Sequence, residues 1–113
     1  MKLSEIAERL SLDVLTPTSD LDVEVTGGYC GDLLSHVLAS ATSGDLWITI
    51  QHHANVVAVA QVAGLSAVVL ADGKQPDDAT RQRALDGGIA LLGSNRSAFE
   101  ISGCLYRLLA DIR

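Results

Sequence analysis

Two adjacent histidines and a cysteine are the residues of this sequence best suited to acid–base or nucleophilic chemistry. His52 and His53 follow the apolar segment DLWITI, residues 45–50, and Cys30 lies in the glycine-rich stretch TGGYCG. A histidine titrates near neutral pH and a cysteine thiolate is a nucleophile, so either could serve a small enzyme. Their spacing, however, gives no Ser-His-Asp or Cys-His arrangement. An enzyme using His52 or Cys30 is therefore the least favoured of three functional hypotheses.

Metal binding by the same residues is not expected. Adjacent side chains point to opposite faces of a strand and lie about 100° apart on a helix, so His52 and His53 would share an ion only from a loop. His36, Cys30 and Cys104 could add ligands, but none stands three or four residues from another histidine or cysteine. The cysteines also lack a CxxC motif, which indicates reduced, buried thiols. We predict no metal site, no cofactor and no disulfide.

Whether the chain could catalyse phosphotransfer can be judged from a more specific sequence motif, the P-loop. A P-loop needs the motif GxxxxGK followed by Ser or Thr, because its glycines and lysine surround the phosphates. The Gly73-Lys74 pair is followed by Gln75, and Val68 stands where the first glycine would be required. An ATP-dependent kinase activity is therefore not expected, and we predict that the chain is not an enzyme.

Composition narrows the class of partner. The chain has 113 residues, 48% of them hydrophobic, which suits one compact domain with a true core. Its formal charge of -6 lacks the basic surface that nucleic-acid binding requires. The most apolar run, residues 56–71, is interrupted and shorter than the roughly 20 residues of a membrane span. The N-terminus has no signal-peptide pattern. We expect a cytoplasmic protein that binds neither nucleic acid nor membrane.

Helical periodicity predicts five helices, at residues 4–11, 32–41, 55–63, 76–86 and 97–112. Ser4 and Asp32 are expected as N-caps, and Pro76 as a first helical residue. Ser97 and Glu100 form the S-x-x-E pattern of a capping box. The last helix carries an apolar stripe made of Ile101, Leu105, Leu108, Leu109 and Ile112.

Four segments are predicted to be strands, at residues 21–25, 45–50, 66–71 and 89–93. The first alternates apolar and acidic residues and ends at Gly27-Gly28, which predicts a half-exposed strand at a sheet edge. The other three are nearly all apolar and are separated by helices, the pattern of a parallel sheet covered on both faces. We predict the fold class α/β: a single domain over residues 1–113, with a mostly parallel sheet of about four strands flanked by helices on both faces.

The predicted fold places polar residues at one rim. Ligands of open parallel sheets bind beyond the carboxyl ends of the strands. Two of these ends lead into helix N-termini near Asn55 and Ser97, where free N–H groups favour anions. Ordinary strand-to-helix turns would give the same pattern, so both interpretations stay open. The candidate ligand-binding residues are Gly28, Tyr29, Cys30, Gln51, His52, His53, Asp72, Gly73, Ser94 and Asn95.

Residues 46–108 also resemble the DRTGG domain. The family's strand ending in Asp-Arg corresponds to residues 47–49 leading to His52-His53, where His-His replaces Asp-Arg. Its strand ending in Thr-Gly-Gly corresponds to residues 69–70, with Ala71-Asp72-Gly73 as the end and Pro76 soon after. Its Thr-Phe-Glu, which opens the last helix, corresponds to residues 97–100. Upstream, residues 28–51 are similar to free-standing members, often labelled HPr serine kinase-like regulators because HPr kinase has a similar N-terminal domain.

The resemblance implies a DRTGG-like fold and a regulatory, self-associating module. The first hypothesis is a non-catalytic homodimer that senses a small ligand, anionic or nucleotide-like, or engages a partner protein. Dimerisation also fits the exposed sheet edge, which gains by being covered. The alternative is an accessory component of HPr/serine-kinase-type phosphotransfer signalling without its own P-loop.

Overall fold

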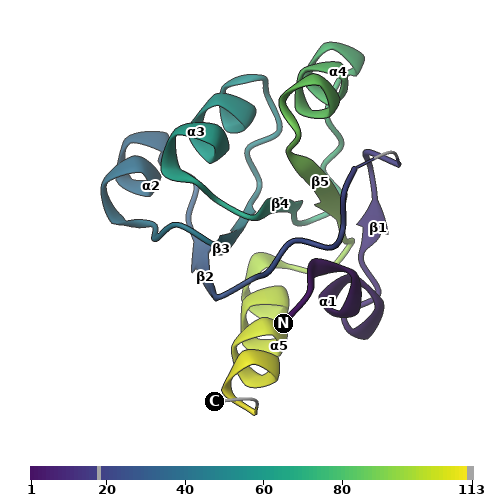
Figure 1. The fold of residues 1–113 in the computed structure, drawn as a ribbon, viewed down its shortest axis with the longest axis vertical. Coiled ribbons are helices and arrows are strands. Elements are labelled where there is room, and N and C mark those ends of the chain that lie inside the picture. The colour runs from purple at the N-terminus through teal and green to yellow at the C-terminus, as the bar shows by residue number, and fades with distance from the viewer. Residues whose placement is uncertain (18, 112–113) are drawn as a thin grey trace.

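The computed structural model describes residues 1–17 and 19–111, which fold into a sheet with helices on both faces (Figure 1). In this part of the chain the sheet has five strands in the order β1-β5-β4-β3-β2. The strands are β1 Asp13–Val14, β2 Gly27–Cys30, β3 Asp45–Thr49, β4 Ala67–Leu70 and β5 Ala90–Gly93. The helices are α1 Leu3–Arg9, α2 Leu34–Ser40, α3 Asn55–Ala63, α4 Asp78–Gly87 and α5 Ala98–Ala110. The predicted α/β class is confirmed.

Strands β2 to β5 run parallel, and β1 runs antiparallel to β5. The sequence predicted about four strands; it did not predict β1, and β2 begins after the predicted first strand at residues 21–25. Asp13 pairs with Gly93 and Val14 with Leu92, so β1 covers the edge of β5 with two residues. A strand this short has no periodicity for a sequence pattern to reveal.

The core has two parts, one on each face of the sheet. Leu46, Ile48 and Val69 face α1 and α5, while Trp47 and Val68 face α2, α3 and α4 (Figure 1). This alternation follows from the two-residue period of a strand, and both faces are apolar because both are covered. β3, β4, β5 and α3 therefore stand where the apolar runs predicted them. None of the described helices is long and apolar enough to cross a membrane.

The predicted strand at residues 21–25 is wrong. The N-terminal segment takes up its backbone groups: Leu3 N–H donates to Val23 O and Val25 N–H to Met1 O, both within 2.9 Å. The strand begins only at Gly27, where the sequence suggested an end, and β2 then forms the edge of the sheet. The alternating apolar residues pack against the α1 side of the core instead.

Three predicted helix starts are also corrected. α1 begins at Leu3 after Lys2, so Ser4 is not its cap. Asp32 does not cap α2, because its carboxylate accepts hydrogen bonds from Thr49 Oγ1 and Ile50 N–H at 2.8 and 3.0 Å. Pro76 precedes α4, which is capped by the Asp77 side chain.

The start of α5 agrees with the sequence. Ser97 and Glu100 form the predicted capping box, and the stripe Ile101, Leu105, Leu108 and Leu109 is buried. Ile112, the last predicted member of that stripe, lies outside the described residues. The cysteines differ from expectation, because Cys30 and Cys104 are free but exposed.

Candidate ligand sites at the sheet rim and the β2 edge

The turns after β4 and β5 meet at the rim formed by the carboxyl ends of the parallel strands. Gly73 N–H donates to Ser94 O and Asp72 N–H to Arg96 O, each at 2.9 Å. Asp72 and Gly73 both adopt left-handed backbone, with φ of 56° and 69°. A Cβ on Gly73 would stand 2.9 Å from Asn95 Oδ1, so a side chain there would collide with the neighbouring turn. Four of the predicted site residues are thus held together.

The two histidines lie at the same rim, between β3 and α3. Their ring centroids are 4.5 Å apart with planes inclined at 34°, and His52 Nδ1 is 3.1 Å from Ile50 O. His52 is partly buried and His53 is exposed. They precede a helix start that differs from those of α4 and α5, since α3 follows Ala54 without a side-chain cap and has no acidic residue in its first turn.

The carboxylate of Asp77 interacts electrostatically with both imidazoles. Hydrogen bonding by Thr80 is the main cause that lowers the pKa of Asp77, and positive charge on His53 and His52 lowers it further. The carboxylate accepts the Thr80 N–H at 2.7 Å, which fixes it at the start of α4. The N-termini of α4 and α5 already carry acidic groups, so α3 offers the most favourable of these starts for an anion.

Gln51 connects the rim to the end of β2. Its Nε2 donates to Asp32 O at 2.9 Å, and its backbone N–H donates to Thr49 Oγ1 at 3.1 Å. Thr49 in turn donates to the Asp32 carboxylate. The loops after β2 and β3 are therefore one hydrogen-bonded unit.

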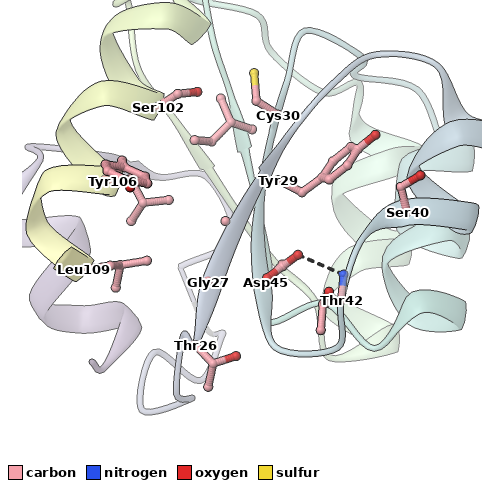
Figure 2. A pocket seen from close by; sticks show the side chains of 13 residues that line it. Thr26, Gly27, Tyr29, Cys30, Ser40, Thr42, Asp45, Ser102, Tyr106 and Leu109 are labelled. Carbon is pink, nitrogen blue, oxygen red and sulfur yellow. Dashed lines mark hydrogen bonds between the residues drawn. The ribbon is translucent and has the colours of Figure 1, made fainter. Parts of the chain in front are cut away.

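The other predicted residues, Gly28, Tyr29 and Cys30, lie away from this rim cluster, along the body of β2. They line a groove of about 540 Å³ between α5 and the segment that joins α2 to β3 (Figure 2). The groove was not predicted, because it depends on how α5 packs over β2. Its lining residues are Thr26, Gly27, Gly28, Tyr29, Cys30, Ser40, Thr42, Asp45, Ile48, Ser102, Leu105, Tyr106 and Leu109.

The groove differs chemically from the rim. Asp45 is its one charged residue within the described chain, and its carboxylate is buried and accepts the Thr42 N–H at 2.9 Å (Figure 2). The remaining lining groups are hydroxyls, a thiol, glycine backbone and apolar side chains. No lysine or arginine of the described residues lines it, so a phosphate would find no counter-charge there.

A polar chain on the α2 side of the groove was missed by sequence reasoning. Tyr29 Oη hydrogen-bonds His36 Nδ1, and His36 Nε2 is 3.4 Å from Ser40 Oγ. The i,i+4 spacing of His36 and Ser40 on one helix was the signal available. Both are exposed, and the chain orients the Tyr29 ring at the groove wall.

The pairing of His52 with Cys30 that a thiol enzyme would require does not occur. Within the described residues they share no hydrogen bond, and His52 instead contacts a backbone carbonyl. No group of three or more His, Cys, Asp or Glu side chains in residues 1–17 and 19–111 could hold a metal ion.

Comparison with known proteins identifies a shared fold. No family model and no curated protein matches the sequence. A crystal structure of the CBS and DRTGG domains of the regulatory region of Clostridium perfringens pyrophosphatase, complexed with the activator diadenosine tetraphosphate, is similar with a TM-score of 0.67. The identity is 15%, and the match covers 92% of this chain and 45% of that chain. The match supports the expected DRTGG-like fold.

Proposed function

We propose that this chain is a non-catalytic regulatory module that binds a small nucleotide-like ligand at the sheet rim and acts as a homodimer. The observation that carries the proposal is the fold it shares with the regulatory region of the clostridial pyrophosphatase, whose structure holds diadenosine tetraphosphate. A ligand regulates such a domain by binding one of its conformations more tightly than another. This requires a binding site but no catalytic chemistry.

The start of α3 is the part of the rim best suited to a phosphate. It has no side-chain cap and no acid in its first turn, and His52 and His53 precede it directly. Backbone N–H groups at a helix start and protonated imidazoles both stabilise an anion. Lys74 and Arg96 follow the neighbouring strands β4 and β5 and add positive charge to a chain whose net charge is -6.

The rim can also transmit binding. The turns after β4 and β5 are joined by backbone hydrogen bonds, and the loops after β2 and β3 by Asp32, Thr49 and Gln51. A ligand that contacts two of these turns would restrict both of them. The proposed output is a change in how the module contacts its partner.

Thermal unfolding with diadenosine tetraphosphate, ATP or inorganic phosphate tests the ligand proposal. A ligand at one hundred times its dissociation constant should stabilise the fold by about 2.7 kcal/mol. His53→Ala should weaken the effect, because it removes an imidazole that precedes the start of α3. Val62→Ala is the matched control, because Val62 is exposed on the same helix.

An unchanged melting temperature with all three compounds would contradict the ligand proposal. Equal stabilisation of the natural chain and of His53→Ala would move the site away from the start of α3.

A further inference from the structure

We propose that the outer edge of β2 is the docking surface for a second copy of this chain, through antiparallel pairing of the two β2 strands into one continuous sheet. This deepens the homodimer of the proposed function, and rests on it, by naming the surface and the register. The ligand site at the rim is not needed for it.

The backbone of β2 offers hydrogen bonds to a further strand. Gly31 N–H donates inward to Ile48 O at 3.2 Å, and backbone groups alternate in direction along a strand. Gly28 and Cys30 therefore direct their N–H and C=O groups away from β3. β2 is the last strand of the sheet in the described residues, so no strand beyond it pairs with these groups.

This edge lacks the features that protect edges from pairing. Gly27–Cys30 contains no charged residue and no proline, and it pairs with β3 residue by residue without a bulge. Proteins usually guard a free edge with charges, proline, a bulge or a covering segment. Here a groove of about 540 Å³ runs along it instead (Figure 2).

The elements beside β2 carry most of the large apolar side chains left in solvent. Of the six large exposed hydrophobics of the described chain, Phe99 and Tyr106 belong to α5, and Leu33 and Leu38 belong to α2 and the residue before it. Tyr106 is 76% exposed although it lines the groove. Of these side chains Tyr106 lines the groove itself, and an exposed aromatic group at a groove is typical of a surface that another protein covers.

The charge distribution favours a second copy over an unrelated partner. A two-fold interface brings each charged group close to its own duplicate, so a chain of net charge -6 meets its copy with least repulsion on a face that carries few exposed charges. The lining of the β2 groove carries a single charged group among the described residues, Asp45, and that carboxylate is buried. This face can meet itself without that repulsion.

The register of the β2–β2 pairing follows from the alternating direction of the backbone groups along β2. Gly28 pairs with Cys30 of the second copy, because both direct their backbone groups outward, and Tyr29 then lies on the two-fold axis opposite its duplicate. Leu105 fills the space beside Gly28, because a Cβ added to Gly28 would be 2.8 Å from Leu105 Cδ2. The axis is perpendicular to the sheet, so α5 lies beside its copy, and the small Ser102 on the groove side of α5 permits close approach.

Sedimentation velocity of the natural chain and of edge variants tests the proposal. The natural chain should be a dimer at micromolar concentration, while Cys30→Lys and Cys30→Glu each raise the dissociation constant at least about tenfold by placing like charges at the pairing edge. An equal mixture of the two variants should regain the dimer. Val62→Lys, which adds the same charge on exposed α3, should leave it unchanged.

Cysteine cross-linking tests the register without relying on charge. In a Cys30→Ser, Cys104→Ser background, Tyr29→Cys should form an intermolecular disulfide under mild oxidation, because opposite residues of a non-hydrogen-bonded pair have Cα atoms about 4.5 Å apart. Val62→Cys in the same background should stay monomeric on a non-reducing gel.

A monomeric natural chain would overturn both the dimer and its surface, including the case in which that monomer binds an extended peptide along β2. A dimer that persists in both Cys30 variants, without a cross-link at position 29, would overturn only the surface. Neither result bears on ligand binding, which the thermal-unfolding experiment measures separately.

Discussion

The rim and the β2 groove divide the candidate residues into two regions of opposite character. The rim gathers His52 and His53 with nearby cations, and its turns are fixed by backbone hydrogen bonds. The groove is lined by hydroxyls, apolar groups and glycine backbone, with the Asp45 carboxylate buried. A rigid polar rim suits a small anion, whereas an uncharged strand edge suits another polypeptide.

If both proposals hold, strand ends and strand edges of one sheet serve different kinds of partner. At a strand end, backbone N–H groups converge on a point with a helix start behind them. Along an edge, they repeat over the length of the strand and recognise another backbone. The regions meet at the loop after β2, where Asp32 contacts Thr49 and Gln51.

Breaking that link should have the largest effect. Thr49 is fully buried, donates to Asp32 at 2.8 Å and accepts from Gln51 N–H at 3.1 Å. Thr49→Val keeps the shape but removes both bonds, so we expect a loss of about 1–3 kcal/mol in the free energy of unfolding. Urea unfolding measures it, and both dimerisation and ligand stabilisation should weaken, because the link positions both regions.

Thr16→Val is a matched control for this loss. Thr16 is equally buried, and its hydroxyl accepts the Leu91 N–H beside β1, far from the link. It should lower stability to a similar extent while leaving the dimer and the ligand effect intact at temperatures where the protein stays folded. If Thr49→Val changed stability alone, the two regions would be independent.

A smaller effect should distinguish the start of α3 from the start of α5 as the ligand site. Ser97→Ala removes the cap of α5, where Ser97 Oγ accepts the Glu100 N–H at 3.2 Å, and should cost about 1 kcal/mol. Thermal unfolding without ligand measures this cost. The ligand-induced rise should persist, since the proposed anion lies at α3, and its disappearance would assign the site to α5 instead.

The elements that the sequence predicted well are those whose residues carry their own pattern. β3, β4 and β5 are continuous apolar runs, and α5 opens with a capping box, so their positions follow from local sequence. Residues 21–25 have an equally clear strand pattern, but the N-terminal segment supplies their backbone partners. That pairing joins residues far apart in the chain, which periodicity does not encode.

The same limit applies to the candidate sites. The rim could be predicted because parallel strands all end on one side, whatever the details of packing. The groove could not, because it requires Leu105 of α5 to lie over Gly28, and no pattern near either residue specifies that contact. Asp32 stands where a helix N-cap is expected, yet its carboxylate instead accepts a hydrogen bond from the Thr49 hydroxyl, 17 residues away.

The smallest expected effect is a pH dependence at the rim. The pKa of Asp77 is lowered from 3.8, chiefly by hydrogen bonding from Thr80. A lowered folded-state pKa means that the stabilising contribution is complete above the unfolded value and disappears as the pH falls through the folded one. Urea midpoints should therefore lose this contribution only below about pH 3.8, and Asp77→Asn should reduce that part of the acid sensitivity.

Asp20→Asn, at an exposed loop position outside the rim, is the control. An unchanged acid profile in Asp77→Asn would show that the carboxylate gains nothing from its place beside Thr80 and the histidines, and would weaken the electrostatic contrast between rim and groove.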